Sequence, residues 1–162
     1  MTLEEFLFSV FKETREWVYV ESSNMPSIDE AIKYGGKWIV YGSKNKVEEL
    51  AQKLRVEIGK YIYALKYSIV PVKVTDDAPI DKHALVVYCL GNNKNYVKNL
   101  LTKLGVKEVG WRYERESWEE IIDNPLLCLK FGLLNIQRLE HISQLIGREN
   151  AKNVKKVRKV VD

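Results

Sequence analysis

The residues that could do chemistry in this chain are basic and aromatic side chains in strand-like segments. Runs rich in β-branched and aromatic residues contain Lys37 and Trp38, then Lys66, then Trp111 and Arg112. Side chains alternate between the two faces of a strand, so Lys66 and Arg112 are expected on the open side of a sheet, with Lys37 extending a basic groove. An arginine there would offer a bidentate fork to an anion. These five residues are the predicted ligand-binding site.

Aromatic residues are numerous, with four tryptophans and nine tyrosines. A row of exposed aromatic side chains on a sheet would stack nucleic-acid bases, at about 1–3 kcal/mol per base. The strand-like run 61–70 places Tyr61, Tyr63 and Tyr67 on one face and Lys66 on the other. Two interpretations remain open. The bulky face packs beneath helices as core, or it forms a platform for bases.

The C-terminal segment 148–162 holds the excess positive charge of the chain. The net charge is +4, and removing this segment leaves 20 basic and 20 acidic residues in positions 1–147. Ala151, Val154, Val157 and Val161 recur at three- and four-residue steps, so the segment is either an amphipathic helix with a basic face or a solvated end. A basic helix could contact phosphates or a protein partner. The predicted nucleic-acid-binding residues are Arg148, Lys152, Lys155, Lys156, Arg158 and Lys159.

Catalytic, metal and cofactor motifs are weak in comparison. The segment 91–94 joins a strand to a helix N-terminus, but it lacks the spacing of a phosphate-binding loop or of a dinucleotide fingerprint. His83 and His141 have no cysteine or carboxylate at metal-ligand spacing, and Cys89 lies in an apolar run. The prediction is therefore no catalytic residue, no metal and no cofactor, which leaves an enzymatic activity uncertain.

Cellular location follows from the cysteines and from hydropathy. Cys89 and Cys128 both lie in apolar runs, as buried free thiols do in a reducing compartment. No apolar run approaches the ~18–20 residues needed to cross a bilayer. The first thirteen residues fit an amphipathic helix better than a signal peptide. We therefore expect a cytoplasmic protein with no membrane partner.

Helix starts are visible as capping boxes at Thr2, Ser27 and Ser117. Apolar stripes predict helices over 44–58 and 93–104, and a helix that follows Pro125 and breaks near Gly132. The predicted strands are 16–20, 37–41, 61–70, 84–90 and 109–114.

This order of elements predicts an α+β domain over residues 1–147, followed by a basic tail over 148–162. Strands 61–70 and 84–90 are joined by a loop without a helix, which favours a mostly antiparallel sheet with helices on one face. A ferredoxin-like sandwich is the alternative.

Several segments also resemble a known family. They are 36–41, residues 47–50 of the helix that follows, strand 65–68, strand 85–88, the 93–105 helix and 111–113. Together they resemble the uncharacterised family of the basophilic leukaemia-expressed protein, which occurs in archaea and eukaryotes. The resemblance implies the curved antiparallel sheet of the cap-binding translation initiation factors and implies no established activity. Trp38 and Trp111 lie in predicted strands and not in loops, so a base sandwich like that of those factors is not visible.

Charge and aromatic content together favour a non-enzymatic nucleic-acid or nucleotide-binding domain, with RNA or single-stranded nucleic acid as partner. One alternative is a protein-interaction module that uses the tail or the sheet face. The other is an enzyme that acts on an anionic small molecule in the sheet groove.

Overall fold

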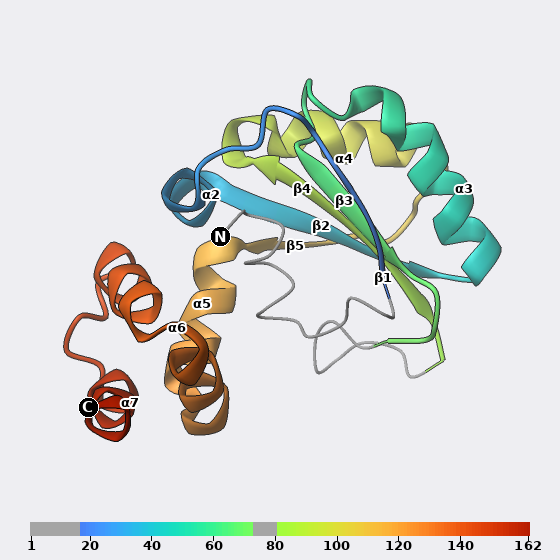
Figure 1. Ribbon diagram of the computed structural model, residues 1–162. Helices are drawn as coiled ribbons and strands as arrows, with labels where there is room; N and C mark the ends of the chain where they lie inside the picture. The colour runs from blue at the N-terminus through green and yellow to red at the C-terminus, as the bar shows by residue number, and fades with distance from the viewer. Residues whose placement is uncertain (1–16, 73–80) are drawn as a thin grey trace.

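The computed structural model describes residues 17–72 and 81–162 (Figure 1). The predicted helix at Thr2 and much of the predicted loop between the third and fourth strands lie outside these residues. The sheet has five antiparallel strands in the order β1-β3-β4-β2-β5. The strands are β1 (Trp17–Glu21), β2 (Gly35–Gly42), β3 (Ala64–Ser68), β4 (His83–Leu90) and β5 (Gly110–Tyr113). The predicted α+β class and the antiparallel sheet are confirmed.

The connections of the sheet interleave two β-α-β units. Helix α3 (Lys44–Leu54) joins β2 to β3, yet β4 lies between these strands. Helix α4 (Lys94–Lys103) joins β4 to β5, yet β2 lies between these two. Such paired split units define the ferredoxin-like arrangement, so the alternative predicted from the sequence describes the core. Strand β1 extends this sheet beside β3.

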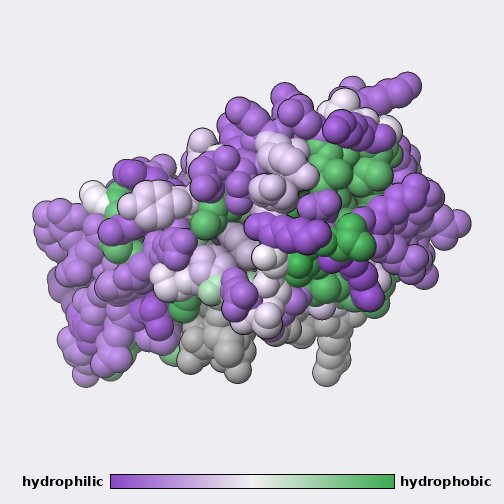
Figure 2. Space-filling model, turned by 90° about the horizontal axis from the view of Figure 1, so that it is seen from above, coloured by the Kyte–Doolittle hydropathy of each residue, from purple (hydrophilic) through white to green (hydrophobic). Residues whose placement is uncertain are grey.

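Helices α3 and α4 lie together on one face of the sheet, as predicted. Val47, Leu50 and Leu54 of α3 and Val97 and Leu101 of α4 are buried against that face. Their outer sides carry mostly hydrophilic side chains, with apolar ones showing between them (Figure 2). The apolar stripe of each helix therefore determines which side of the helix packs against the sheet.

The opposite face of the sheet is covered by other helices, so helices lie on both faces and not on one face alone. Helix α5 (Glu114–Asp123) packs Trp118, Ile121 and Ile122 into a core cluster that also contains Val86 and Tyr88 of β4. Helix α6 (Pro125–Leu145) packs beside α5, and the Trp118 and Phe131 rings meet edge to face, with centres 4.9 Å apart. The short helix α2 (Ile28–Tyr34) joins the same cluster through Ala31 and Ile32.

The predicted boundaries of α2 are confirmed, whereas the predicted end of the 44–58 helix, the start at Ser117 and the break at Gly132 are wrong. The Ser27 side chain accepts a hydrogen bond from Glu30 N (3.1 Å) and caps α2, which ends at Gly35 as predicted. Ser117 does not cap a helix, because β5 runs directly into α5 and places Ser117 inside the first turns. The break in α6 lies at Asn135 and not at Gly132, because the Asn135 side chain accepts from Arg138 N (3.0 Å) and starts a new helical stretch.

The C-terminal segment is an ordered helix, α7 (Lys152–Val161), so the helical interpretation of 148–162 describes it. Val154 and Val157 are buried in the core cluster that also contains Val86 and Tyr88 of β4. Gly132 of α6 permits the close approach of α7, because a Cβ atom there would lie 2.2 Å from Val157 Cγ1. The segment is therefore packed against the domain on α6.

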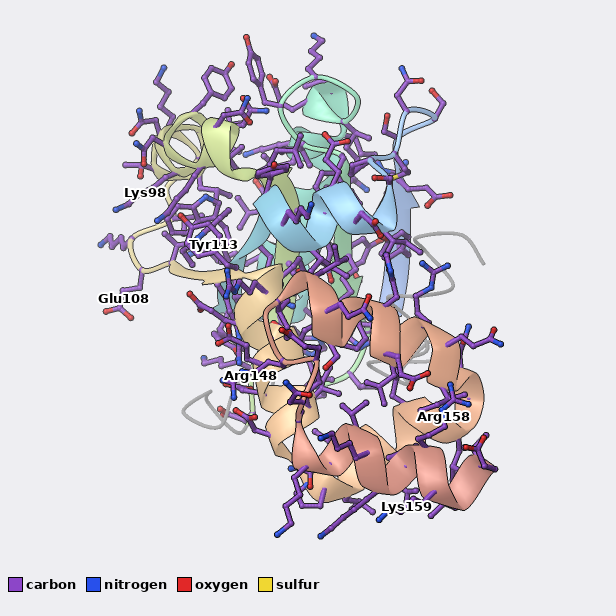
Figure 3. The ribbon with its side chains drawn as sticks, turned by 90° about the vertical axis from the view of Figure 1, so that its left-hand side faces the viewer. Lys98, Glu108, Tyr113, Arg148, Arg158 and Lys159 are labelled. Atoms are coloured by element: carbon purple, nitrogen blue, oxygen red, sulfur yellow. The ribbon has the colours of Figure 1, made fainter. Side chains whose placement is uncertain are left out.

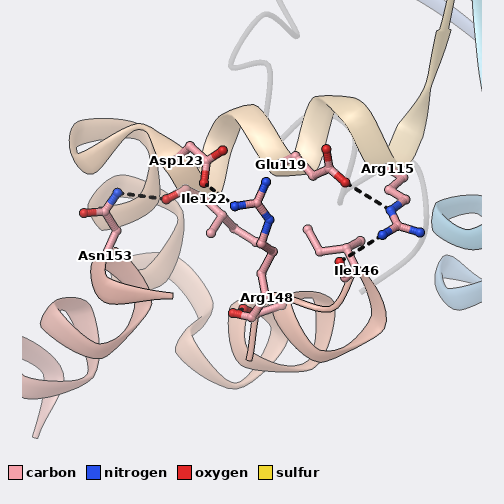
Figure 4. Close-up of polar contacts among 8 residues, drawn as sticks. Arg115, Glu119, Ile122, Asp123, Ile146, Arg148 and Asn153 are labelled. Atoms are coloured by element: carbon pink, nitrogen blue, oxygen red, sulfur yellow. Dashed lines mark hydrogen bonds and ion pairs between the residues drawn. The ribbon is translucent and has the colours of Figure 1, made fainter. Parts of the chain in front are cut away.

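Hydrogen bonds between α5 and the segment where α6 connects to α7 hold this connection in place (Figure 4). Arg115 donates to the Ile146 carbonyl oxygen (3.2 Å), and Asn153 Nδ2 donates to the Ile122 carbonyl oxygen (2.9 Å). Arg148 Nη1 lies 3.2 Å from Asp123 Oδ1. These contacts fix where α7 begins and hence where its side chains point.

Candidate nucleic-acid interface

The predicted basic groove is the first candidate, and its three cations do share one face of the sheet. Lys37 pairs in register with Arg112 of β5 and with Tyr88 of β4. Lys66 pairs with Val86, which lies two residues from Tyr88 on β4, so Lys66 is on the same face. The prediction that this face is open is wrong, however, since Lys37 is 1 % exposed and Lys66 is 3 % exposed. Arg112 forms an ion pair with Glu120. None of the three cations offers an open anion site here.

The buried lysines are held by groups that come from distant parts of the sequence. Lys37 Nζ lies 3.3 Å from Oε1 of Glu114, the first residue of α5, and both side chains are almost fully buried. Lys66 Nζ lies 4.0 Å from the centre of the Trp17 ring of β1. A buried charge needs such partners, because its desolvation would otherwise cost several kcal/mol. These lysines therefore have a structural role.

Trp38 and Trp111, the other two predicted ligand-binding residues, lie on the opposite face of the sheet. They pair in register on β2 and β5, and their rings are 5.0 Å apart at 57°. Trp38 is buried, and its Nε1–H donates to the Lys94 carbonyl oxygen (3.0 Å). Strand alternation therefore divides the five predicted residues between two faces, so they do not form one site.

Trp111 belongs instead to an aromatic–lysine cluster between β5 and α4, which consists of Trp38, Trp111, Tyr113, Lys94 and Lys98. The rings of Trp111 and Tyr113 meet at 89°, with centres 5.3 Å apart. The Lys94 ammonium lies 5.1 Å from the Trp111 ring centre, 5.4 Å from that of Tyr113 and 5.9 Å from that of Trp38. Such distances allow cation–π attraction.

The position of the Trp111 ring depends on a glycine beneath it. A Cβ atom on Gly36 would lie 2.2 Å from Trp111 Cζ2, so only glycine lets the ring pack this closely against β2. The ring's Nε1–H is shielded from solvent and has no hydrogen-bond partner within the described residues. Packing, and not hydrogen bonding, therefore orients Trp111.

Sequence reasoning missed the lysines of this cluster. Residues 91–107 contain four lysines and no acid, but they belong to a body, residues 1–147, that is neutral overall. A charge count over short windows would have found this segment. The hypothesis of a phosphate site at 91–94 included one residue of the aromatic–lysine cluster, Lys94. The ammonium of Lys94 lies near the Trp111 and Tyr113 rings.

The second basic surface is a row of four lysines on α7. Lys152, Lys155, Lys156 and Lys159 are exposed and repeat at three- and four-residue steps, which places them on one side of the helix. Val154 and Val157 are buried on the other side, and α7 itself contains no acidic residue. Within the part of the chain that the structure describes, none of these four side chains has an ion-pair partner. We call this row the α7 lysine stripe.

The two arginines predicted to bind nucleic acid have a different role. Arg158 forms an ion pair with Glu140 of α6 and another with Asp162 (3.3 Å), which together raise the pKa of its guanidinium. Arg148 pairs with Asp123 of α5. Figure 3 places Arg158 on the α6 side of α7 and Lys159 on the outer side. The arginines attach the helix, and the lysines face solvent.

Both cysteines are expected to be unreactive while the protein is folded. Burial raises the pKa of the Cys89 thiol to about 12 and that of Cys128 to about 11, so the reactive thiolate is scarce at pH 8. Titration with Ellman's reagent should find no rapidly reacting thiol in the native protein and two after unfolding in guanidinium. A native thiol that reacts as fast as free cysteine would contradict this expectation.

Comparisons with known proteins add no assignment, since no family model, curated protein or solved structure matches this chain. In residues 17–72 and 81–162, no helix combines the length and the apolar character that crossing a bilayer requires.

Proposed function

We propose that this chain is a non-enzymatic nucleic-acid-binding domain whose α7 lysine stripe contacts the phosphate backbone. The observation that carries the proposal is the stripe itself, with four exposed lysines on a helix that is packed against the domain and no acid among them. Lysine contacts with phosphates release bound counterions and supply most of the affinity of sequence-independent binding.

The geometry of the stripe favours a polyanion with closely spaced charges. Lys152 and Lys159 are separated by about 10 Å along the helix axis, at 1.5 Å per residue. Each nucleic-acid strand carries one charge per roughly 3.4 Å of duplex axis, so several phosphates fit within this length. A membrane surface fits less well, because a membrane-binding helix inserts its apolar face, and here Val154 and Val157 are buried against α6.

The experiment that tests this proposal is a salt titration of binding to a fluorescein-labelled single-stranded RNA of 20 nucleotides. Four phosphate contacts predict a slope of about −2.8 in log K against log salt, which is an affinity loss of about 50-fold between 50 and 200 mM salt. A variant with Lys152→Gln, Lys155→Gln, Lys156→Gln and Lys159→Gln should lose most of this slope, with its thermal unfolding unchanged because the four lysines are exposed.

A matched control removes four exposed lysines elsewhere. Lys33→Gln, Lys44→Gln, Lys46→Gln and Lys60→Gln lower the net charge equally but leave α7 intact. This control should keep the slope of the unmodified protein. The proposal fails if the two quadruple variants weaken binding equally, or if the unmodified protein binds RNA and DNA more weakly than about 100 µM at 50 mM salt.

A further inference from the structure

The aromatic–lysine cluster between β5 and α4 is a second surface with properties that the α7 lysine stripe lacks. We infer that this cluster is a stacking site for unpaired bases, so that the preferred ligand is single-stranded nucleic acid. The inference rests on the nucleic-acid binding proposed above, but it concerns different residues and a different interaction.

The accessible part of the cluster is aromatic. Tyr113 is 38 % exposed, and Trp111 is the only one of the four tryptophans that is not buried. Their perpendicular rings form a corner, in which a base stacked on one ring would meet the edge of the other. Base stacking on aromatic side chains tolerates any sequence, because every base has a π-face.

The cationic part of the cluster lies beside these rings. Lys94 is held near both rings, and Lys98, one turn later on α4, lies 5.7 Å from the Trp38 ring centre. Figure 3 shows Lys98 and Tyr113 on the same side of the molecule, with Glu108 bordering them on the β5 side. A strand that stacks its bases on Trp111 and Tyr113 therefore has Lys94 and Lys98 for its phosphates on the α4 side.

A single strand satisfies this geometry and a duplex does not. The faces of paired bases are covered by their neighbours in the stack, so a duplex can offer the cluster only its phosphates. Exposed aromatic rings flanked by lysines are the combination that binds single strands without sequence preference. The cluster therefore adds selectivity for single strands to the charge-driven binding of α7.

The test compares three ligands of equal length, namely a single-stranded RNA, its duplex and an abasic strand. Tyr113→Ala should weaken binding of the single strand by about 5- to 150-fold and leave the other two affinities unchanged. Tyr113→Leu preserves the bulk at the start of α5 and should weaken single-strand binding similarly, which separates stacking from misfolding. Tyr96→Ala, which removes an exposed tyrosine elsewhere on α4, is the matched control and should have no effect.

Fluorescence gives an independent readout. Single-stranded RNA should quench tryptophan emission, and Trp111→Phe should abolish the quenching, since the other three tryptophans are buried. Equal affinities of Tyr113→Ala and the unmodified protein for the single strand would overturn the stacking site. The salt slope of the α7 lysine stripe would be unaffected by that outcome, so the two proposals can fail separately.

Discussion

Lys37→Met is expected to lower the free energy of unfolding by about 3–5 kcal/mol, because it leaves the Glu114 carboxylate buried without its ion-pair partner. Both side chains are almost fully excluded from water, so solvent cannot replace the lost interaction. The Lys37 ammonium also lies 5.9 Å from the centre of the Tyr88 ring, an attraction that methionine would lose. Urea unfolding followed by circular dichroism measures the change.

Two further variants separate the ion pair from packing. Lys37→Met combined with Glu114→Leu removes both charges, and it should recover most of the lost stability, since a buried pair replaced by apolar residues is often tolerated. Lys46→Met on the exposed side of α3 is the control and should change stability by less than about 0.5 kcal/mol. A single Lys37→Met variant as stable as this control would contradict the structural role that we assign to Lys37.

Gly132→Val is expected to destabilise the protein by about 2–3 kcal/mol, because the new side chain would overlap Val157 where α6 and α7 touch. Valine is a slightly better helix former than glycine, so a loss of stability would come from packing and not from helix propensity. Helix α7 has ten residues, and an isolated helix of this length is marginal in water. Forcing it from α6 should therefore also increase amide hydrogen exchange over residues 152–161.

The control for this prediction is Leu133→Val, the adjacent residue of α6, whose side chain is largely exposed. It should change neither stability nor exchange appreciably. Adding Val157→Ala to Gly132→Val provides space for the new side chain and should restore part of the stability. If Gly132→Val leaves the exchange of α7 unchanged, the close contact at Gly132 does not hold the helix in place.

Much of the fold could be predicted from sequence because local patterns determine single elements. The stripe of Val47, Leu50 and Leu54 identified α3, and the short run before Leu90 identified β4. Local patterns do not determine which strands become neighbours, so the interleaved order appeared only as an alternative. The kink in α6 was misplaced for a similar reason. Gly132 suggests a break by its residue type, but its role is to permit contact with Val157, a residue distant in the sequence.

The candidate site could be predicted only in part. Strand alternation correctly placed Lys37, Lys66 and Arg112 on one face, but it says nothing about what covers that face. Glu114 and Trp17, which hold the two lysines, lie far from them in sequence. The α7 lysine stripe could be predicted because the spacing of its lysines is visible within one short segment of the sequence. Lys94 and Lys98 of α4 were not predicted, because the net charge of residues 1–147 is zero and hides the local excess of lysines in α4.

The interleaved sheet has a consequence for synthesis on the ribosome. Among the described strands, only β3 and β4 are neighbours both in sequence and in the sheet. Strand β2, with the apolar run Trp38–Val40, gains its first neighbour when β4 has been made and its second when β5 follows. Translation at 5–20 residues per second separates β2 from β4 by roughly 2–10 s. During this interval the nascent chain carries an unpaired, apolar strand that can associate with other chains. In the finished protein, the same strand is protected in the interior of the sheet.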